Sequence, residues 1–145
     1  MKTRFTSHKL TCLLFIFSFS LQPQASTTDD INFRKLSVNE GLSQNTIWGM
    51  MQDANNKIWI GTTDGLNRYD GHTFTTYYHS SNDSLSIANN QIISLCTDSE
   101  GTSWFGTLVG LSRYNAETDN FTNYLLPGTP FQILAIEDAP DEGVL

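Results

Sequence analysis

Two arginines are the side chains of this chain whose type and position best suit binding of a charged group. Arg68 and Arg113 each precede a tyrosine, Tyr69 and Tyr114. A guanidinium can hold a carboxylate through two parallel hydrogen bonds, which would suit a uronate or another anion. Because both arginines occupy the same place in a repeated motif, an ion pair or a stacking contact inside the fold is the favoured interpretation.

The three tryptophans could stack on sugar rings, but their positions differ. Trp59 and Trp104 recur at equivalent places in mid-strand, which favours burial between structural units over contact with a ligand. Trp48 has Ile93 as its counterpart and belongs to the strand expected nearest a central channel, where it could line a ligand surface. The candidate ligand-binding residues are therefore Trp48, Arg68 and Arg113.

Residue patterns that carry catalysis or metal binding are not found. His72 and His79 have no cysteine or carboxylate at ligand spacing. A glycine-rich phosphate loop with lysine and a nucleophile elbow are also missing. We therefore expect no metal, no cofactor and no catalytic residue in this chain.

The elements that must position the candidate residues come from an internal repeat. Residues 47–69 and 92–114 lie 45 residues apart and agree at nine of 23 positions. A repeat of this length indicates one structural unit used more than once. The shared motif consists of Trp59, Gly61, Gly65, Arg68 and Tyr69, matched by Trp104, Gly106, Gly110, Arg113 and Tyr114.

Each copy has the pattern of four short antiparallel strands joined by tight turns. Asp64-Gly65 is a hairpin signal, because glycine supplies the positive φ that such a turn needs. The first strand is apolar on both faces, which predicts a strand sandwiched between two layers. Four such strands recurring every 45 residues predict an all-β fold, a fragment of a β-propeller. The strands expected in the first copy are 47–52, 58–62, 66–69 and 74–78, and the last strand of the second copy is 121–124.

The predicted organisation begins with a secretory signal peptide over 1–25. It has a basic start, an apolar stretch over 10–21 and a small residue, Ala25, for cleavage; an uncleaved anchor is the alternative. Because the third copy stops before its tryptophan, we expect the chain to be the N-terminal piece of a longer protein. The remaining segments are a lead-in over 26–44 with an outer strand at 33–36, blade 1 over 45–78, a loop over 79–89, blade 2 over 90–124 and the start of blade 3 over 125–145.

Charge and cysteine content narrow the possible partners. The net charge is −7, which is poorly suited to nucleic acid or anionic lipid. Cys96 is the only cysteine after the predicted leader, so no internal disulfide is expected. It aligns with Met51, which favours a buried apolar position over a reactive thiol.

The segments Trp59–Asp70 and Trp104–Asn115 resemble the two-component regulator propeller repeat, and residues 33–43 are similar to the usual lead-in of that family. The resemblance implies an exported, periplasmic sensor region. In relatives, further blades, a β-sandwich and a membrane helix lead to an output module, often a histidine kinase of a phosphorelay or a diguanylate cyclase. It also implies an oligosaccharide or another small ligand as a partner.

No such output module is present in this sequence, so we expect no enzymatic activity of the chain itself. Two other functions stay open. Residues 98–104 resemble the aspartate box of propeller glycosidases, with one residue too many, but the carboxyl pair that glycoside cleavage needs does not stand out. A protein-interaction scaffold is the other alternative.

Overall fold

The computed structural model describes residues 32–125, 132–139 and 143–144. Residues 34–145 make up one unit, and the description below concerns that unit. The signal peptide predicted for 1–25 lies outside the described residues.

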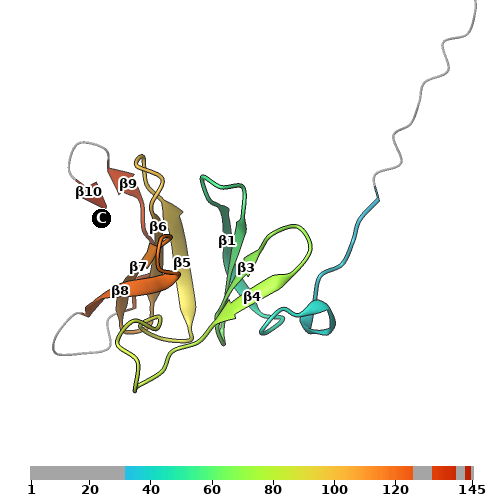
Figure 1. Ribbon diagram of the computed structural model, residues 1–145, viewed down its shortest axis with the longest axis horizontal. Helices are drawn as coiled ribbons and strands as arrows, with labels where there is room; N and C mark the ends of the chain where they lie inside the picture. The colour runs from blue at the N-terminus through green and yellow to red at the C-terminus, as the bar shows by residue number, and fades with distance from the viewer. Residues whose placement is uncertain (1–31, 126–131, 140–142, 145) are drawn as a thin grey trace, which may run out of the picture. The chain divides into compact units, whose positions relative to one another are not determined.

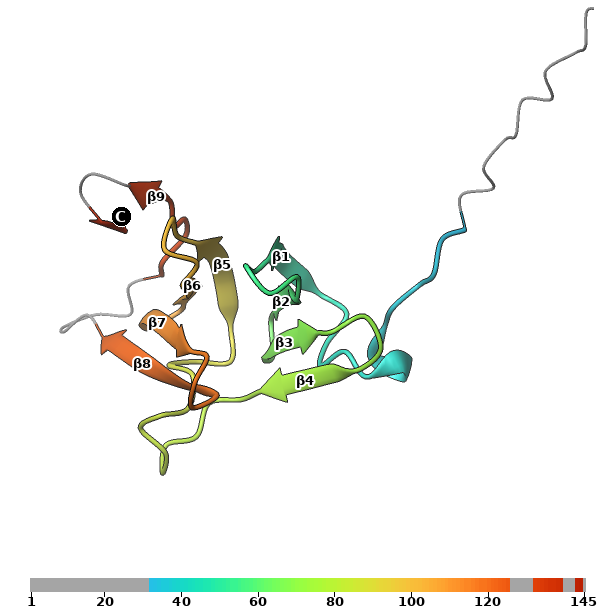
Figure 2. The same ribbon diagram turned by 45° about the horizontal axis from the view of Figure 1, so that its top comes forward.

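Two four-stranded antiparallel sheets form the unit, and each follows the order of the chain. The first sheet, blade 1, and the second, blade 2, are distinct in Figures 1 and 2. Their strand bounds match the predicted ones to within one residue, so the prediction of propeller blades is confirmed. Blade 1 contains β1 (Ile47–Gln52), β2 (Ile58–Thr62), β3 (Leu66–Tyr69) and β4 (Phe74–Tyr77), and blade 2 contains β5 (Ile92–Thr97), β6 (Ser103–Thr107), β7 (Gly110–Asn115) and β8 (Asn120–Leu125).

The turn after the second strand has the same construction in both blades. In blade 1 the Thr62 hydroxyl donates to the carbonyl of Gly65 at 2.8 Å, and Gly65 has φ +107°, which disfavours other residues. In blade 2 the Thr107 hydroxyl donates to the carbonyl of Gly110 at the same distance. A Cβ atom would lie 2.9 Å from Tyr78 Cε1 at Gly65 and 2.5 Å from the backbone oxygen of Tyr124 at Gly110, which explains why each copy keeps its glycine while the residue before it changes.

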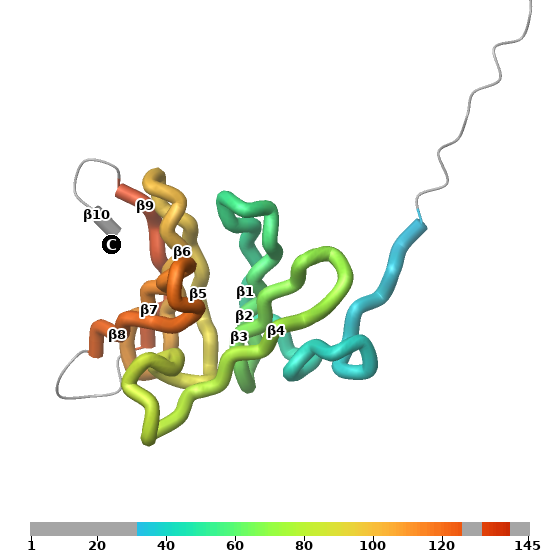
Figure 3. Tube along the Cα trace, viewed as in Figure 1, coloured from blue at the N-terminus to red at the C-terminus, as the bar shows by residue number. Residues whose placement is uncertain are grey.

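The core lies between the two blades. Trp59 and Leu66 of blade 1 are fully buried against Phe105 and Phe121 of blade 2. Ile87, from the loop that connects the blades (Figure 3), belongs to the same cluster. The prediction that Trp59 packs between blades is therefore confirmed.

The blades approach each other through their first strands. β1 and β5 lie side by side, and Figure 1 shows them at the boundary between the two sheets. Each of these strands has a bulge at the same place, because the pairing with the second strand skips Trp48 in β1 and Ile93 in β5.

The expectation that β1 is covered on both faces is wrong. Trp48 and Met50 are 58% and 65% exposed, and Ile47 is 42% exposed. The equivalent strand β5 is more enclosed, and its Ile92 is fully buried. β1 is more exposed than β5 because β1 packs against β5 with one face only. The described residues place no sheet against the other face of β1.

The two ends of the described chain differ from the blades. The outer strand predicted over 33–36 is not formed, and Phe33 is 90% exposed, because a strand needs a hydrogen-bonded neighbour and none of the described strands pairs with it. A capped 3-10 turn, Val38–Glu40, follows. At the other end β9 (Asp138–Ala139) pairs antiparallel with β10 (Gly143–Val144), as the start of a third blade requires.

Candidate functional site

Arg68 lies at the centre of a cluster between the blades. Its guanidinium carbon is 5.5 Å from the ring centres of Trp59 and Tyr77 in blade 1, and 5.7 Å from that of Tyr114 in blade 2. Its Nη1 atom also lies 3.0 Å from Asp119 Oδ1 and donates to the Tyr114 hydroxyl. The inter-blade arginine cluster consists of these five residues.

Asp119 collects the hydrogen bonds of this cluster. Its Oδ1 atom accepts from the hydroxyls of Tyr77 at 2.6 Å and Tyr114 at 2.5 Å. Burial raises the pKa of Asp119, but the two hydroxyls and the Arg68 charge outweigh it and hold that pKa below its usual value. Burial and the bond to Asp119 raise the pKa of Tyr77 far above its usual value. The cluster therefore keeps a carboxylate, two neutral phenols and a guanidinium in contact.

The aspartate that follows the first strand of each blade closes a turn. Asp53 Oδ1 accepts from the amides of Asn55 and Lys57 at 2.8 and 2.9 Å. Asp98 Oδ1 accepts from the amides of Glu100 and Thr102 at 3.1 and 2.8 Å. The sequence alone did not predict that the other oxygen of each aspartate accepts from a tryptophan. Those two bonds join Asp53 to Trp59 and Asp98 to Trp104.

The hydrogen bonds that Asp98 accepts favour a structural role over a catalytic or metal-binding one. Burial raises the pKa of Asp98, but bonds from the Trp104 indole and the turn amides outweigh it, so the net shift is downward. Among the described residues, no group of three His, Cys, Asp or Glu side chains could hold a metal ion.

Arg113 is placed differently from Arg68, although the sequence motif is the same. It is exposed and donates to Asn115 Oδ1 at 3.2 Å. Trp104, opposite Arg113 in the sheet, packs on Tyr124 with ring centres 5.9 Å apart. The structure therefore shows one arginine inside an interface and the other at an open face.

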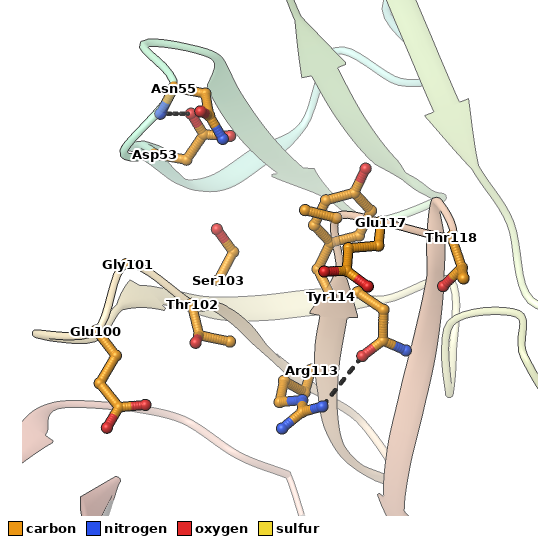
Figure 4. Close-up of a pocket in the computed structure, with 12 residues that line it drawn as sticks. Asp53, Asn55, Glu100, Gly101, Thr102, Ser103, Arg113, Tyr114, Glu117 and Thr118 are labelled. Carbon is orange, nitrogen blue, oxygen red and sulfur yellow. Dashed lines mark hydrogen bonds between the residues drawn. The ribbon is translucent and has the colours of Figure 1, made fainter.

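The two candidate arginines line two adjoining cavities. A cavity of about 460 Å³ includes Arg113 in its lining, and a second of about 320 Å³ includes Arg68. Figure 4 shows Asp53 and Asn55 of blade 1 facing residues of blade 2 across the first cavity. Both cavities are lined by Asp53, Asn55, Tyr114 and Ala116.

The lining of these cavities mixes carboxylates, basic groups and amides. Arg113 and Asn115 share it with Glu100 and Glu117 in the first cavity, and Lys57 lies near Asp70 in the second. Such a surface can donate and accept hydrogen bonds to a polar molecule. The sequence pointed only to Arg68 and Arg113 of this lining, because the other residues come from turns of two blades that meet only in the folded chain.

Trp48, the third candidate, lines neither cavity. It is the bulge residue of β1, and 58% of its surface is exposed. Bulges turn a side chain away from the regular pleat, so Trp48 is an accessible aromatic surface on the inner strand. The structure does not bring it together with the two arginines.

Cys96 fits the predicted apolar position better than a reactive one. It is partly buried, and burial together with the carboxylates of Asp138, Asp98 and Glu137 raises the pKa of its thiol. A raised pKa disfavours the nucleophilic thiolate.

Comparison with known proteins agrees with this geometry. The family model described as two component regulator propeller matches residues 41–64. The chain is 39% identical over 75 residues to Histidine kinase P4 of Formosa agariphila, covering 52% of this chain and 6% of that kinase. No helix in the described part of this chain is long and apolar enough to cross a membrane.

Solved structures with the same fold are extracellular domains. The domain named for the hybrid two component system BT3049 of B. thetaiotaomicron is 34% identical, with a TM-score of 0.59 over 70% of this chain and 14% of that chain. The domain named for BT4673 of the same organism is 23% identical, with a TM-score of 0.63 over 75% of this chain and 15% of that chain, and shows the fold alone.

This chain spans only a small part of the length of each relative. The matched family model, the repeated motif and the two packed blades nevertheless agree on the type of repeat. Residues 41–64 match the two-component regulator propeller repeat, and the β-propeller fold of the chain is shared with the extracellular domain of a hybrid two component system.

Proposed function

We propose that this chain is the ligand-sensing propeller region of an exported two-component sensor protein. The observation that carries the proposal is the fold and 34% identity shared with the extracellular domain of a hybrid two component system. The identity to a histidine kinase over 75 residues supports the same assignment. The chain would lie in the periplasm and pass a binding signal to a membrane-anchored output module.

The proposed role is binding without catalysis. The paired cavities supply polar groups from two blades, and Trp48 supplies an exposed aromatic surface. These features suit a polar ligand such as an oligosaccharide, held by hydrogen bonds and by stacking. The residues proposed to contact it are Trp48, Arg68 and Arg113.

The proposal is tested by ligand binding and by product analysis with the same sample. The purified chain is mixed with acidic and neutral oligosaccharides, and the melting temperature is followed, because a ligand that binds the folded state raises it. We expect an upward shift with at least one sugar, reduced by Trp48→Ala or Arg113→Gln, and an unchanged sugar afterwards. Cleaved sugar would favour a glycosidase, and a chain that stays in the cytoplasm on fractionation would contradict the sensor assignment.

A further inference from the structure

The larger of the two cavities contains a hydroxyl group that no described residue satisfies. Ser103 begins β6 and is only 4% exposed, and its Oγ atom has no hydrogen-bond partner in the part of the chain that the structure describes. No side-chain nitrogen or oxygen in that part is both sealed from solvent and unpartnered, so this Oγ atom opens into the cavity that Ser103 lines. Figure 4 shows it pointing toward the turn of blade 1 that carries Asp53.

The repeat does not account for a buried serine at this place. The equivalent residue of blade 1, 45 positions earlier, is Ile58, so the blade itself does not need a hydroxyl here. Burying a hydroxyl without a hydrogen bond costs free energy, and a molecule in the cavity can supply the missing bond. Ser103 is therefore a buried polar contact that faces a ligand site.

The charges around this cavity favour a cation over an anion. Its lining has one guanidinium, that of Arg113, against three carboxylates, those of Asp53, Glu100 and Glu117. The one ion pair among the described residues joins Arg68 to Asp119, so no base neutralises either glutamate. The smaller cavity is balanced, because Lys57 and Arg68 face Asp53 and Asp70 there. A positive charge is therefore most favourable in the larger cavity.

The three carboxylates differ in what they can offer to such a charge. Asp53 already accepts from two turn amides and from the Trp59 indole, so it contributes mainly its charge. Glu100 and Glu117 are exposed, and their carboxylates are free to accept from a ligand. In Figure 4 the Glu117 carboxylate lies beside Tyr114, whereas the Glu100 side chain extends away from the blade 1 turn. Glu117 is therefore the better-placed acceptor for an ammonium group.

We propose that the larger cavity binds a sugar with a free amino group, holding its ammonium at Glu117 and one of its hydroxyls at Ser103. The inference rests on the proposed function, since it names the class of oligosaccharide that the chain would bind. A volume of about 460 Å³ lies within the range of small-ligand pockets. Asn55 and Arg113 also line the cavity and can donate to the sugar hydroxyls. A uronate would meet an excess of negative charge in the same place.

The test compares three short sugars that differ in charge. Chitotriose carries free amines, its N-acetylated form is neutral, and trigalacturonate is acidic. Each is titrated calorimetrically into the unaltered chain at low salt and about pH 6, where an amine is protonated. We expect chitotriose to bind more tightly than the other two and to lose affinity as salt is added, because salt screens exposed charges.

Two serine variants separate binding from folding. Ser103→Ala should weaken chitotriose binding by about threefold to tenfold and leave the urea unfolding curve unchanged, because its hydroxyl has no partner to lose. Ser112→Ala is the matched control. Its buried hydroxyl donates to Asn123 Oδ1 at 2.7 Å and accepts from the amide of Ala88 at 3.1 Å, so this variant should unfold more easily and keep its affinity. Unchanged affinity in Ser103→Ala would overturn the proposal.

A pair of glutamate variants tests the placement of the ammonium. Glu117→Gln should weaken chitotriose binding by about threefold. Glu137→Gln removes an exposed carboxylate that lines neither cavity and should keep the original affinity. Equal losses in the two variants would mean general attraction to an acidic chain and would contradict the assigned site.

The choice of sugars also distinguishes this inference from the proposed function. Tighter binding of the N-acetylated or the acidic trisaccharide would overturn the preference for an amino sugar and leave the role in oligosaccharide binding intact. A chain that binds none of the three would overturn the amino-sugar site, and if it also fails with the wider set of oligosaccharides, the proposed sensing of sugars falls with it.

Discussion

The indole Nε1 of Trp59 donates a 2.8 Å hydrogen bond to Asp53 Oδ2, across the turn that joins the first two strands of blade 1. The other oxygen of Asp53 accepts from two amides of that turn. One carboxylate therefore closes a turn and fixes the orientation of the tryptophan that packs between the blades. Trp104 and Asp98 repeat the bond at the same length in blade 2.

Replacing the blade 1 aspartate should destabilise the fold. Asp53→Ala removes a charged acceptor from two turn amides and from the indole of Trp59. Only Trp59 is fully buried, so the loss of its bond, about 1.5–3 kcal/mol, sets most of the cost. We expect a drop in the free energy of unfolding of about 2 kcal/mol in urea denaturation. Asp98→Ala should cost less, because Trp104 is more exposed than Trp59 and water can satisfy its indole.

The exposed Glu117, changed to alanine, is the control for loss of a surface carboxylate. Its unfolding midpoint should stay at that of the original chain. Equal losses for the Asp53 and Asp98 variants would show that burial of the tryptophan does not set the size of the effect.

The two repeat arginines should respond differently to lysine. Arg68→Lys keeps the charge but loses the planar group that stacks on three rings. We expect a loss of about 1 kcal/mol, within the range of such contacts; the exposed ion pair with Asp119 adds little. Arg113→Lys is the matched control, and its unfolding curve should be unchanged. A larger loss for Arg113→Lys would mean that the open face of blade 2 is covered in solution.

Acid should weaken the contact between the blades through Asp119. Its folded-state pKa is lowered, so its contribution is complete above the unfolded pKa of about 3.9 and is lost as the pH falls through the folded pKa. We expect the free energy of unfolding to fall below about pH 4 and to fall less steeply in Asp119→Asn. Asp98 and Asp70 also have lowered pKa values, that of Asp70 reaching about 2, so part of the pH dependence should remain.

Unfolding curves at several pH values below 6 measure this dependence. Glu117→Gln, which removes an exposed carboxylate from the same turn, is the control and should keep the original slope. An Asp119→Asn variant with that same slope would contradict the assigned role of Asp119.

The repeat predicted the fold well because its strands and turns are local features. Alternating residues and the turn glycine Gly65 fixed the strand bounds, and the recurrence of Trp59 correctly indicated burial. Asp119 was not foreseen, because it lies in the turn that is two residues longer in blade 2 and has no counterpart in blade 1. The sequence also did not predict the exposure of Met50. The apolar side chains of β1 show that both faces of this strand can be covered, but the described residues cover only the face opposite Met50.

The glycine of the second strand should tolerate a methyl group better than the turn glycine of blade 2. In Gly61→Ala the new Cβ would lie 2.8 Å from Ile92 Cγ2 and 3.0 Å from Leu95 Cδ1, which are side-chain atoms that can shift. In Gly110→Ala it would lie 2.5 Å from the backbone oxygen of Tyr124, which cannot move without breaking the pairing of β7 and β8. We expect a loss of about 1–3 kcal/mol for the first and a larger loss for the second, both measured by urea unfolding.

Trp48 and Trp59 lie on neighbouring strands, and their replacement separates binding from folding. Trp48→Ala removes a side chain that is 58% exposed, so the free energy of unfolding should change by no more than about 0.5 kcal/mol. Trp59→Ala empties a fully buried position and should cost about 3–5 kcal/mol. If Trp48 contacts the ligand, its variant keeps the original unfolding curve yet loses the ligand-induced rise in melting temperature. A Trp48→Ala variant that unfolds as easily as Trp59→Ala would show instead that this face of β1 is packed, and Trp48 would then be a core residue with no direct part in binding.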